Sequence, residues 1–349
     1  MRFIHIADVH LGAEPDVGER LSRIRPRELW ETFEKVIAIC EEEQVDLLLI
    51  AGDLFRRQPL MRELKEVDYL FSTLTHTKVV LIAGNHDYIA PSSYYRSFQW
   101  SENVIPLFQE DPGYVVFEEM NTAVYGFSYY SREIRGALYD EVSAKGLAER
   151  EILLAHGGDE KHIPIRRSVL ERSGFDYIAL GHIHRQQEMI PNRVVYAGAL
   201  EPTDRNDIGS HGYIRGEIKN GVVRTEFVPL AKREYKQLVL KIEPDMTAGG
   251  LRAWLKQIVR ESGEENLYRF ILKGFRDADV TFDLISSFVG ENILEITDET
   301  KVAYDMERLR MENEENLIGK YIRLFDGCEA GSVEEQALYE GVQALLENR

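Results

Sequence analysis

The run at residues 78–83, apolar and β-branched after Lys78, is followed at once by Gly84, Asn85, His86 and Asp87. Such a run is typical of a strand buried in a parallel sheet. We expect Gly84 to allow a sharp turn at the carboxyl end of this strand, where open α/β sheets place their sites. The turn would present an amide oxygen that can ligate a hard cation and an imidazole that can pass on a proton. It would also present a carboxylate, Asp87, that can hold that imidazole in one tautomer.

The same arrangement occurs twice earlier in the chain. An apolar run at residues 2–7 leads to Asp8 and His10, and another at 46–51 leads to Asp53. Amphipathic segments separate the three runs, so the first ninety residues repeat strand, polar loop and helix. This repeat predicts a parallel sheet with right-handed crossovers. If the loop after residue 7 is extended, Asp8 and His10 point to the same side.

Two later apolar runs also end in histidine. Residues 151–155 lead to His156, and residues 177–180 lead to His182 and His184, which share a face by the same alternation. Short alternating strands are expected between residues 104 and 128. The strands from residue 194 to 228 are expected to be antiparallel, with a hairpin turn at Asn220 and Gly221.

Seven side chains of metal-ligand type therefore follow predicted strands, namely Asp8, His10, Asp53, Asn85, His156, His182 and His184. Any one of them, taken alone, is as well explained as a loop or capping residue. The full set has oxygen and imidazole donors but no thiolate, which favours two hard or borderline divalent ions over one structural zinc. Two ions about 3.5–4 Å apart can clamp a phosphoryl group and activate a water molecule. His86 could then protonate the departing oxygen or hydrogen-bond the phosphate.

Charge and cysteine content limit the classes of function. The net charge of the 349 residues is −18; residues 1–232 hold 27 basic and 36 acidic residues, and residues 233–349 hold 15 and 24. No basic domain indicates nucleic-acid binding, so a polyanion would have to be held by local arginines and bound cations. Cys40 and Cys328 are too few for a disulfide framework, which fits the cytoplasm. Strand-like sequence begins at Arg2 and no apolar run approaches membrane-spanning length, so neither a leader nor a membrane partner is expected.

The pattern changes near residues 231–235. Beyond them the sequence predicts a small α+β unit, with strands at 237–242, 268–274 and 293–296, a helix at 251–259 and a short helix around Ile285. Two amphipathic helices, at 312–325 and 334–346, are expected to end the chain. The predicted domains are thus 1–232 with the site, 233–304 as a capping domain, and 305–349 as a helical pair. The apolar stripes of that pair either dock a partner or pack on the chain's own α+β unit.

The order Asp-x-His, Gly-Asp, Gly-Asn-His-Asp, His, Gly-His-x-His is similar to that of the calcineurin-like metallophosphoesterase superfamily. Within that superfamily, Ile-Ala-Asp-Val-His-Leu-Gly at 6–12, Gly-Asp-Leu-Phe at 52–55 and Ala-Leu-Gly-His-Ile-His at 179–184 resemble DNA repair exonucleases of the SbcD type. Archaeal and eukaryotic relatives of those enzymes are nucleases of double-strand-break repair. The resemblance covers residues 1–228 well, and the later α+β unit resembles that family's capping domain more loosely.

The resemblance implies an α/β fold, a four-layer metallophosphoesterase sandwich of two mixed β-sheets flanked by helices, with a smaller C-terminal α+β capping domain. It also implies the distribution of the ligands: Asp8, His10 and His184 on one metal, Asn85, His156 and His182 on the other, and Asp53 as the bridge. Mn²⁺ is the usual ion of the family, with Fe²⁺ and Zn²⁺ as alternatives. The implied function is a two-metal DNA exonuclease, with single-strand endonuclease activity left open, that works with an SMC-like ATPase subunit. A homodimer is also left open.

One departure from the family concerns the substrate. Some of these nucleases carry His or Asp three positions after the bridging Asp, whereas this chain has Arg56, followed by Arg57. These arginines either contact phosphate or are solvated loop residues. The ligand set also occurs in protein phosphatases, but here Asp rather than Glu follows Gly-Asn-His, and Gly52-Asp53 lacks the Val-Asp-Arg-Gly continuation. A small-molecule or cyclic-nucleotide phosphodiesterase and a non-catalytic scaffold of the same fold remain as alternatives.

Overall fold

The computed structural model describes residues 1–15, 17, 19–282, 292–329 and 331–347. The chain forms two compact units. The first comprises Met1–Lys236 and Glu265–Leu267, and the second comprises Gln237–Glu264 and Tyr268–Arg349. The finer division expected from the sequence, into 1–232, 233–304 and 305–349, stays a prediction.

Two six-stranded sheets form the first unit, with strand orders β12-β11-β1-β2-β3-β4 and β5-β6-β7-β8-β10-β9. The strands of the first sheet are β1 (Arg2–Ile6), β2 (Leu47–Ala51), β3 (Lys78–Ile82), β4 (Val104–Pro106), β11 (Gly212–Lys219) and β12 (Val222–Pro229). Those of the second sheet are β5 (Gly113–Phe117), β6 (Thr122–Gly126), β7 (Arg150–His156), β8 (Tyr177–Gly181), β9 (Gln187–Ile190) and β10 (Val194–Tyr196).

Strand direction places the ends of the central strands together. Strands β1 to β4 run parallel, as the strand–loop–helix repeat predicts, and β6, β7 and β8 also run parallel. The hairpin between β11 and β12 turns at Asn220 and Gly221, both with positive φ, as expected. The antiparallel pairing expected after residue 194 is found for β11 with β12 and with β1, but β10 also has a parallel neighbour that was not expected. Strand β9 brings the chain back across the sheet, so β10 runs parallel to β8 and antiparallel only to β9.

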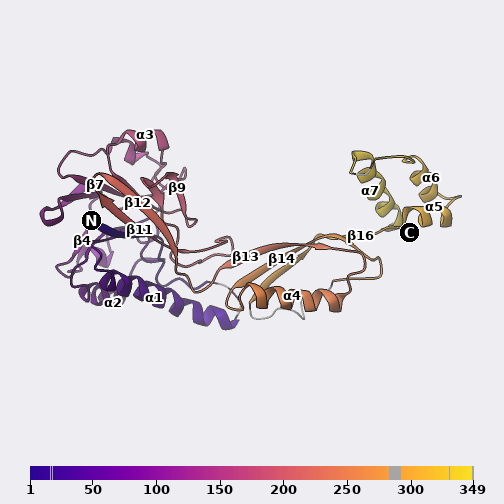
Figure 1. Cartoon of the computed structure of the whole chain (residues 1–349), viewed down its shortest axis with the longest axis horizontal. Helices are drawn as coiled ribbons and strands as arrows, with labels where there is room; N and C mark the ends of the chain where they lie inside the picture. Colours follow the sequence, from indigo (N-terminus) through magenta and orange to yellow (C-terminus); the bar gives the residue numbers. More distant parts are fainter. Residues whose placement is uncertain (16, 18, 283–291, 330, 348–349) are drawn as a thin grey trace. The chain divides into compact units, whose positions relative to one another are not determined.

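Three apolar layers hold this sandwich together. The layer between the sheets contains Leu49 of the first sheet and Ile152 of the second. Helices α1 (Glu19–Glu42) and α2 (Met61–Ser72) cover the outer face of the first sheet, and α3 (Arg167–Arg172) lies on the opposite side, over the second sheet (Figure 1). Two mixed sheets flanked by helices confirm the fold expected from the sequence.

The spacing of apolar residues explains why α1 packs as it does. Its buried face includes Leu29, Phe33, Val36, Ile37 and Cys40, all at most 3% exposed. These positions recur at three- and four-residue intervals, so they form one stripe along the helix. The stripe faces the first sheet and leaves the charged residues between them toward solvent.

The second unit contains a four-stranded sheet and a helix, which confirms the smaller C-terminal α+β unit. The sheet comprises β13 (Tyr235–Ile242), β14 (Leu267–Arg276), β15 (Ile293–Asp298) and β16 (Lys301–Val302), and the helix is α4 (Ala248–Ser262). Leu251 and Leu255 of α4 pack against Phe270 of β14. The short helix expected around Ile285 lies outside the described residues.

The described part of the chain continues into three helices rather than the two expected. These are α5 (Met306–Glu312), α6 (Leu317–Arg323) and α7 (Val333–Glu347). Residues 313–316 separate α5 from α6, and the side chain of Asn316 caps α6 by accepting from the backbone N–H groups of Ile318 and Gly319. The predicted apolar stripes pack mainly on each other, through Ile318 and Ile322 of α6 and Val342 of α7. None of the helices in the described ranges is long and apolar enough to cross a membrane.

Candidate metal centre

The seven predicted ligands lie where strands of both sheets end. In chain order they are Asp8 and His10 after β1, Asp53 after β2, Asn85 after β3, His156 at the end of β7, and His182 and His184 after β8. Strand β2 packs against both β7 and β8, and β3 packs against β7. The loops of the first sheet and those of the second therefore meet at one edge of the sandwich.

Four of these ligands have a left-handed backbone. The φ angles are 50° for Asp8, 52° for His10, 51° for Asp53 and 96° for His182. Asp8 and His10 do lie together as expected, with Nε2 of His10 4.0 Å from Oδ1 of Asp8. The reason expected for this pair and for His182 and His184, an extended chain, is wrong. A non-glycine residue in the left-handed region costs about 1–3 kcal/mol, and such residues cluster at functional sites. The local turns, rather than strand alternation, aim these side chains.

Gly84 is required for space rather than for an unusual backbone angle. A methyl group added to it would lie 2.3 Å from Oδ1 of Asp53 and 2.7 Å from Nε2 of His156. Gly84 is absent from the residues of positive φ, so the sharp turn expected from the sequence is not the reason for this glycine. It allows the backbone after β3 to approach two predicted ligands.

Asp8, His10 and His184 form a first group, with ligand atoms within 4.8 Å of one another. Nε2 of His10 lies 3.0 Å from Nε2 of His184. Oδ2 of Asp8 accepts a hydrogen bond from the backbone N–H of His182 (2.8 Å), whereas Oδ1 is buried and has no hydrogen-bond partner among the described residues. Burial raises the pKa of Asp8 to about 6. A cation at Oδ1 would stabilise this otherwise unfavourable charge.

Asp53 lies between this group and the remaining ligands. Its Oδ2 is 3.9 Å from Nε2 of His10 and 3.5 Å from Nε2 of His156. Oδ1 of Asn85 is 2.9 Å from Nε2 of His156 and 3.0 Å from Nδ1 of His182. Burial disfavours the charged form of Asp53, but the hydrogen bond and charge of His156 together with the charges of His10 and His86 hold the pKa of Asp53 below its usual range. Burial would lower the pKa of His156, yet Asp53 raises it to about 9.

This geometry fits divalent cations. Nδ1 of His156 donates to the backbone oxygen of Ala51 (2.9 Å), because a carbonyl can only accept. Nε2 of His156 therefore faces Asp53 and Asn85 with a lone pair, or with a proton that a cation would displace. Donors of this kind suit hard or borderline divalent ions. The structure thus brings all seven predicted ligands together, while their division between two ions and the bridging role of Asp53 stay predictions.

His86 lies half-buried beside the ligands. Its backbone N–H donates to Oδ1 of Asp53 (2.8 Å), and Nη1 of Arg56 is 2.7 Å from its Nε2. Burial lowers the pKa of His86; Asp53 opposes this effect, and the charges of Arg56 and Arg132 act in the same direction as burial. A neutral imidazole is a poorer proton source, but its N–H can donate a hydrogen bond to a phosphate oxygen.

Asp87 does not hold His86, and that expected role is corrected. Its Oδ1 accepts from the backbone N–H of Gly84 (2.8 Å), and its Oδ2 accepts from the hydroxyl of Tyr95 (2.9 Å) and from the backbone N–H of Phe55 (3.2 Å). These donors direct the buried carboxylate away from the imidazole. Asp87 instead ties the loop after β3 to the loop after β2, which carries Asp53.

A hollow of about 380 Å³ adjoins His86, and it is lined by Arg56, Arg57, Gln58, His86, Tyr88 and Arg132. The two predicted arginines differ in their surroundings. Arg57 forms an ion pair with Glu63 (2.8 Å), whereas Arg56 contacts His86. Arg132 was not predicted, because it follows β6 and nothing in the local sequence links it to the loops after β2 and β3.

Two carboxylates that the sequence did not single out contact the predicted ligands. Oδ2 of Asp159 is 2.7 Å from Nε2 of His182, and Oδ1 of Asp207 is 3.1 Å from Nδ1 of His184. Asp159 could have been found, because it follows His156 by three residues in the loop after a predicted strand. Asp207 follows its histidine by 23 residues, so no local pattern indicates it.

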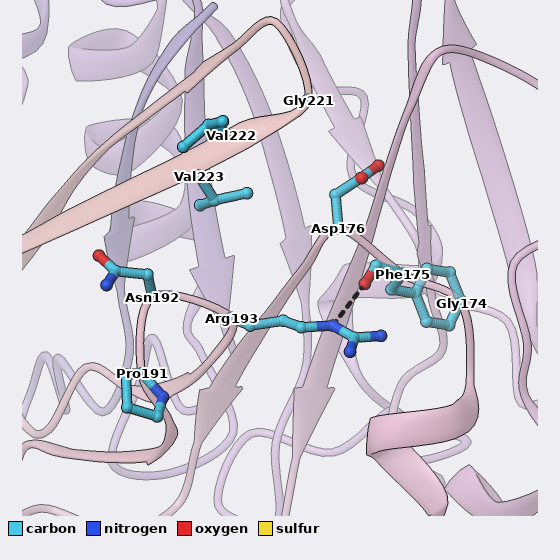
Figure 2. A pocket seen from close by; sticks show the side chains of 9 residues that line it. All are labelled: Gly174, Phe175, Asp176, Pro191, Asn192, Arg193, Gly221, Val222 and Val223. Carbon is cyan, nitrogen blue, oxygen red and sulfur yellow. Dashed lines mark hydrogen bonds between the residues drawn. The ribbon is translucent and has the colours of Figure 1, made fainter.

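A second hollow, of about 450 Å³, lies where β8 and β10 begin and beside the β11–β12 turn (Figure 2). Nε of Arg193 donates to the backbone oxygen of Phe175 (3.0 Å) across it. Asp176 is already hydrogen-bonded to the backbone N–H of Glu151 (2.8 Å). None of the seven predicted ligands lines this hollow, so it is separate from the candidate metal centre.

Comparison with known proteins agrees with this geometry. Residues 1–186 match the model of the calcineurin-like phosphoesterase family. The chain is 28% identical over 304 residues to the uncharacterized metallophosphoesterase YhaO of Bacillus subtilis, covering 78% of this chain and 72% of that protein. It is 28% identical over 265 residues to the DNA double-strand break repair protein Mre11 of Methanopyrus kandleri, and 27% identical over 234 residues to that of Aeropyrum pernix. These alignments cover 65% and 60% of this chain, and it spans only 56% of each Mre11 protein.

Proposed function

The chain belongs to the calcineurin-like phosphoesterase family, and from this premise we propose that it is a two-metal phosphodiesterase that cleaves DNA. Members of this family are metal-binding hydrolases of phosphoesters. The observation that carries the proposal is the position of Asp53 Oδ2, 3.9 Å from Nε2 of His10 and 3.5 Å from Nε2 of His156. One carboxylate thus lies within reach of two ligand groups, as a bridge between two cations requires.

The proposed mechanism assigns a task to each part of the site. Asp8, His10 and His184 would hold one cation, Asn85, His156 and His182 would hold the other, and Asp53 would bridge them. When bound, the pair would supply Lewis-acid stabilisation of the phosphoryl oxygens and an activated water. His86, at the rim, donates an N–H hydrogen bond to a phosphate oxygen, where negative charge increases as the leaving oxygen departs. Mn²⁺ is the proposed ion, with Fe²⁺ and Zn²⁺ as alternatives.

The arginine-lined hollow supports a nucleic-acid substrate. Arg56 and Arg132 lie beside His86 in a chain whose net charge is −18, so positive charge is concentrated where a phosphate next to the scissile one would lie. We propose that these two guanidiniums contact that phosphate. Arg57 is paired with Glu63, so we propose that it does not contact the phosphate directly and affects binding only by positioning the loop that carries Arg56.

The two archaeal relatives named as DNA double-strand break repair proteins support a role in DNA repair. By the same resemblance we propose an SMC-like ATPase subunit as partner, a homodimer as an alternative assembly, and a location in the cytoplasm. An acidic nuclease gains little from non-specific attraction to DNA and benefits from a partner that grips it.

The proposed function is tested by a cleavage assay with Mn²⁺ on single- and double-stranded DNA of defined ends. Asp53→Asn is the inactive control, because a neutral amide cannot bridge two dications. We expect Mn²⁺-dependent shortening of DNA by the wild type and at least a 10²-fold slower reaction by the variant. Metal-dependent activity on cyclic dinucleotides with none on DNA would overturn the proposal.

Activity on cyclic dinucleotides without activity on DNA would instead indicate the main alternative, a phosphodiesterase of small molecules. The hollow of about 380 Å³ beside His86 is within the size range of small-ligand pockets, roughly 300–1,000 Å³. A non-catalytic scaffold is less well supported, because the ligand set is complete. Elemental analysis of the purified protein separates the scaffold from both enzymes, since a scaffold would retain no stoichiometric metal.

The helices α5 to α7 are proposed as the element that docks the ATPase. Their common core contains Ile318 and Val342, whereas the core of the preceding α+β unit ends at Ile296. Truncation after Asp305 should therefore leave the α+β core intact. We expect the shortened protein to keep its nuclease activity but to lose co-purification with an ATPase encoded beside it. Insoluble protein or a large fall in melting temperature would mean that these helices belong to the structural core.

A further inference from the structure

The two histidines of the Gly-His-x-His segment present different ring nitrogens to the metal centre. His182 points Nδ1 toward Oδ1 of Asn85 (3.0 Å), and His184 points Nε2 toward Nε2 of His10 (3.0 Å). Each ring has its other nitrogen against a carboxylate. Nε2 of His182 is 2.7 Å from Oδ2 of Asp159, and Nδ1 of His184 is 3.1 Å from both oxygens of Asp207.

A carboxylate can only accept a hydrogen bond, so the nitrogen that faces it must carry the hydrogen. His182 is therefore held with hydrogen on Nε2, and His184 with hydrogen on Nδ1. The inward nitrogen is then the one that can offer a lone pair to a cation. Carboxylates behind metal-binding histidines fix the tautomer and the ring orientation in this way.

From this geometry we infer that Asp159 and Asp207 are positioning residues that hold the two histidines in opposite tautomers, and so direct them to different metal ions. The inference rests on the proposed two-metal centre. It adds two residues to that centre, and it explains how histidines only two positions apart can serve separate ions.

Asp159 is built to hold this position. Its Oδ1 accepts from the backbone N–H groups of Lys161 (2.7 Å) and His162 (3.0 Å), and the ring of His162 donates from Nδ1 to Oδ2 (2.8 Å). The rings of His162 and His182 lie 4.6 Å apart. These contacts hold the carboxylate in place, so its Oδ2 remains aimed at Nε2 of His182.

Because of the same contacts, the substitution Asp159→Asn tests whether Asp159 sets the tautomer of His182. The backbone donors at Lys161 and His162 would keep the amide oxygen at the Oδ1 position, which places the amide NH₂ against Nε2 of His182. Nε2 would then have to accept, and the ring hydrogen would move to Nδ1, the inward nitrogen. The substitution thus reverses the tautomer without removing bulk. Asp159 is 47% exposed at its side chain, so the fold should tolerate the change.

The measurement is calorimetric titration of the full-length, metal-free protein with Mn²⁺, together with its electron paramagnetic resonance spectrum. We expect the wild type to bind two ions and to show the spectrum of a coupled pair. In Asp159→Asn, one of the two affinities should fall about 10–100-fold and the coupled spectrum should weaken at limiting Mn²⁺. Glu160→Gln, which removes the same charge from the neighbouring exposed position, should match the wild type, and Asp159→Glu should recover part of the lost affinity.

Three results would overturn the inference. The first is two unchanged affinities in Asp159→Asn, and the second is an equal loss of affinity in Glu160→Gln. The third is a further ion in the wild type that Asp159→Asn loses, because Asp159, His162 and His182 also place ligand atoms within 4.8 Å of one another and Asp159 would then be a ligand itself. A wild type that binds no Mn²⁺ would instead refute the proposed two-metal function.

Discussion

Replacement of Gly84 by alanine tests whether the approach of β3 to the ligands sets the geometry of the centre. The new methyl group would lie 2.3 Å from Oδ1 of Asp53, whereas ordinary contact requires about 3.4 Å. Either the carboxylate or the backbone must therefore move by about 1 Å, and the methyl group also crowds His156 at 2.7 Å. A displacement of this size at a catalytic site costs roughly 10²-fold in rate. Overpacking of this kind typically lowers the free energy of unfolding by about 1–3 kcal/mol.

The assay is Mn²⁺-dependent hydrolysis of a chromogenic phosphodiester, with the melting temperature measured on the same samples. Gly249→Ala is the matched control, because a methyl group at Gly249 in α4 meets nothing within 4 Å. We expect Gly84→Ala to lose about 10²-fold in rate at saturating Mn²⁺ and to bind Mn²⁺ more weakly, and Gly249→Ala to retain the wild-type rate. A wild-type rate and Mn²⁺ affinity in Gly84→Ala would show that this edge of the sandwich is not the reacting centre.

Three further predictions concern single residues. Asp53→Asn should lose at least one metal by elemental analysis, since the amide removes a charge that both ions share; two ions at full occupancy would mean that Asp53 is not the bridge. His86→Ala should keep both metals but lose about 10²–10³-fold in turnover, because it removes one hydrogen-bond donor to the phosphate oxygen, and a near-wild-type rate would remove His86 from the mechanism. Burial lowers the pKa of His5 from 6.5 to about 3. Between these pH values the unfolded chain binds a proton at His5 that the folded chain does not bind. The free energy of unfolding should therefore fall as the pH drops from 6.5 toward 3. This fall is at most about 1.4 kcal/mol per pH unit; urea unfolding at several pH values should give a shallower dependence in His5→Phe, and an unchanged slope would contradict the assignment.

The sequence predicts most of this fold because parallel strands and polar loops leave a strong local pattern. Runs such as residues 78–83 identify buried strands, and the residue after each run lies at the edge where strands end. The seven ligand types could be listed on that basis alone, but their convergence depends on the packing of two different sheets, which no local pattern indicates. The direction of β10 could not be predicted in the same way, because it depends on where β9 returns the chain.

The side-chain geometry of the site could not be predicted from the sequence, for physical reasons that differ from residue to residue. Alternation along an extended strand does not apply to Asp8 or His182, whose backbones are left-handed. Sequence adjacency suggested that Asp87 holds His86, but its oxygens accept from Tyr95 and Phe55 instead. Arg132 and Asp207 reach the centre only through tertiary packing, and no local pattern marks a residue of that kind.

The ligands come from both sheets, and this has a consequence for how the protein reaches its active state. Asp8 lies near the start of the chain and His184 lies past its midpoint. An N-terminal fragment that ends before residue 184 therefore lacks at least one predicted ligand. During synthesis the centre can be loaded only after β8 has joined β7 and the second sheet has docked on the first. Cations bound across that junction would then resist separation of the sheets, with about 2.7 kcal/mol at a free ion concentration one hundred times the dissociation constant. Cellular metal supply would thereby set the lifetime of the folded phosphoesterase as well as its turnover, and a metal-starved cell would hold a pool of protein that is both idle and more readily degraded.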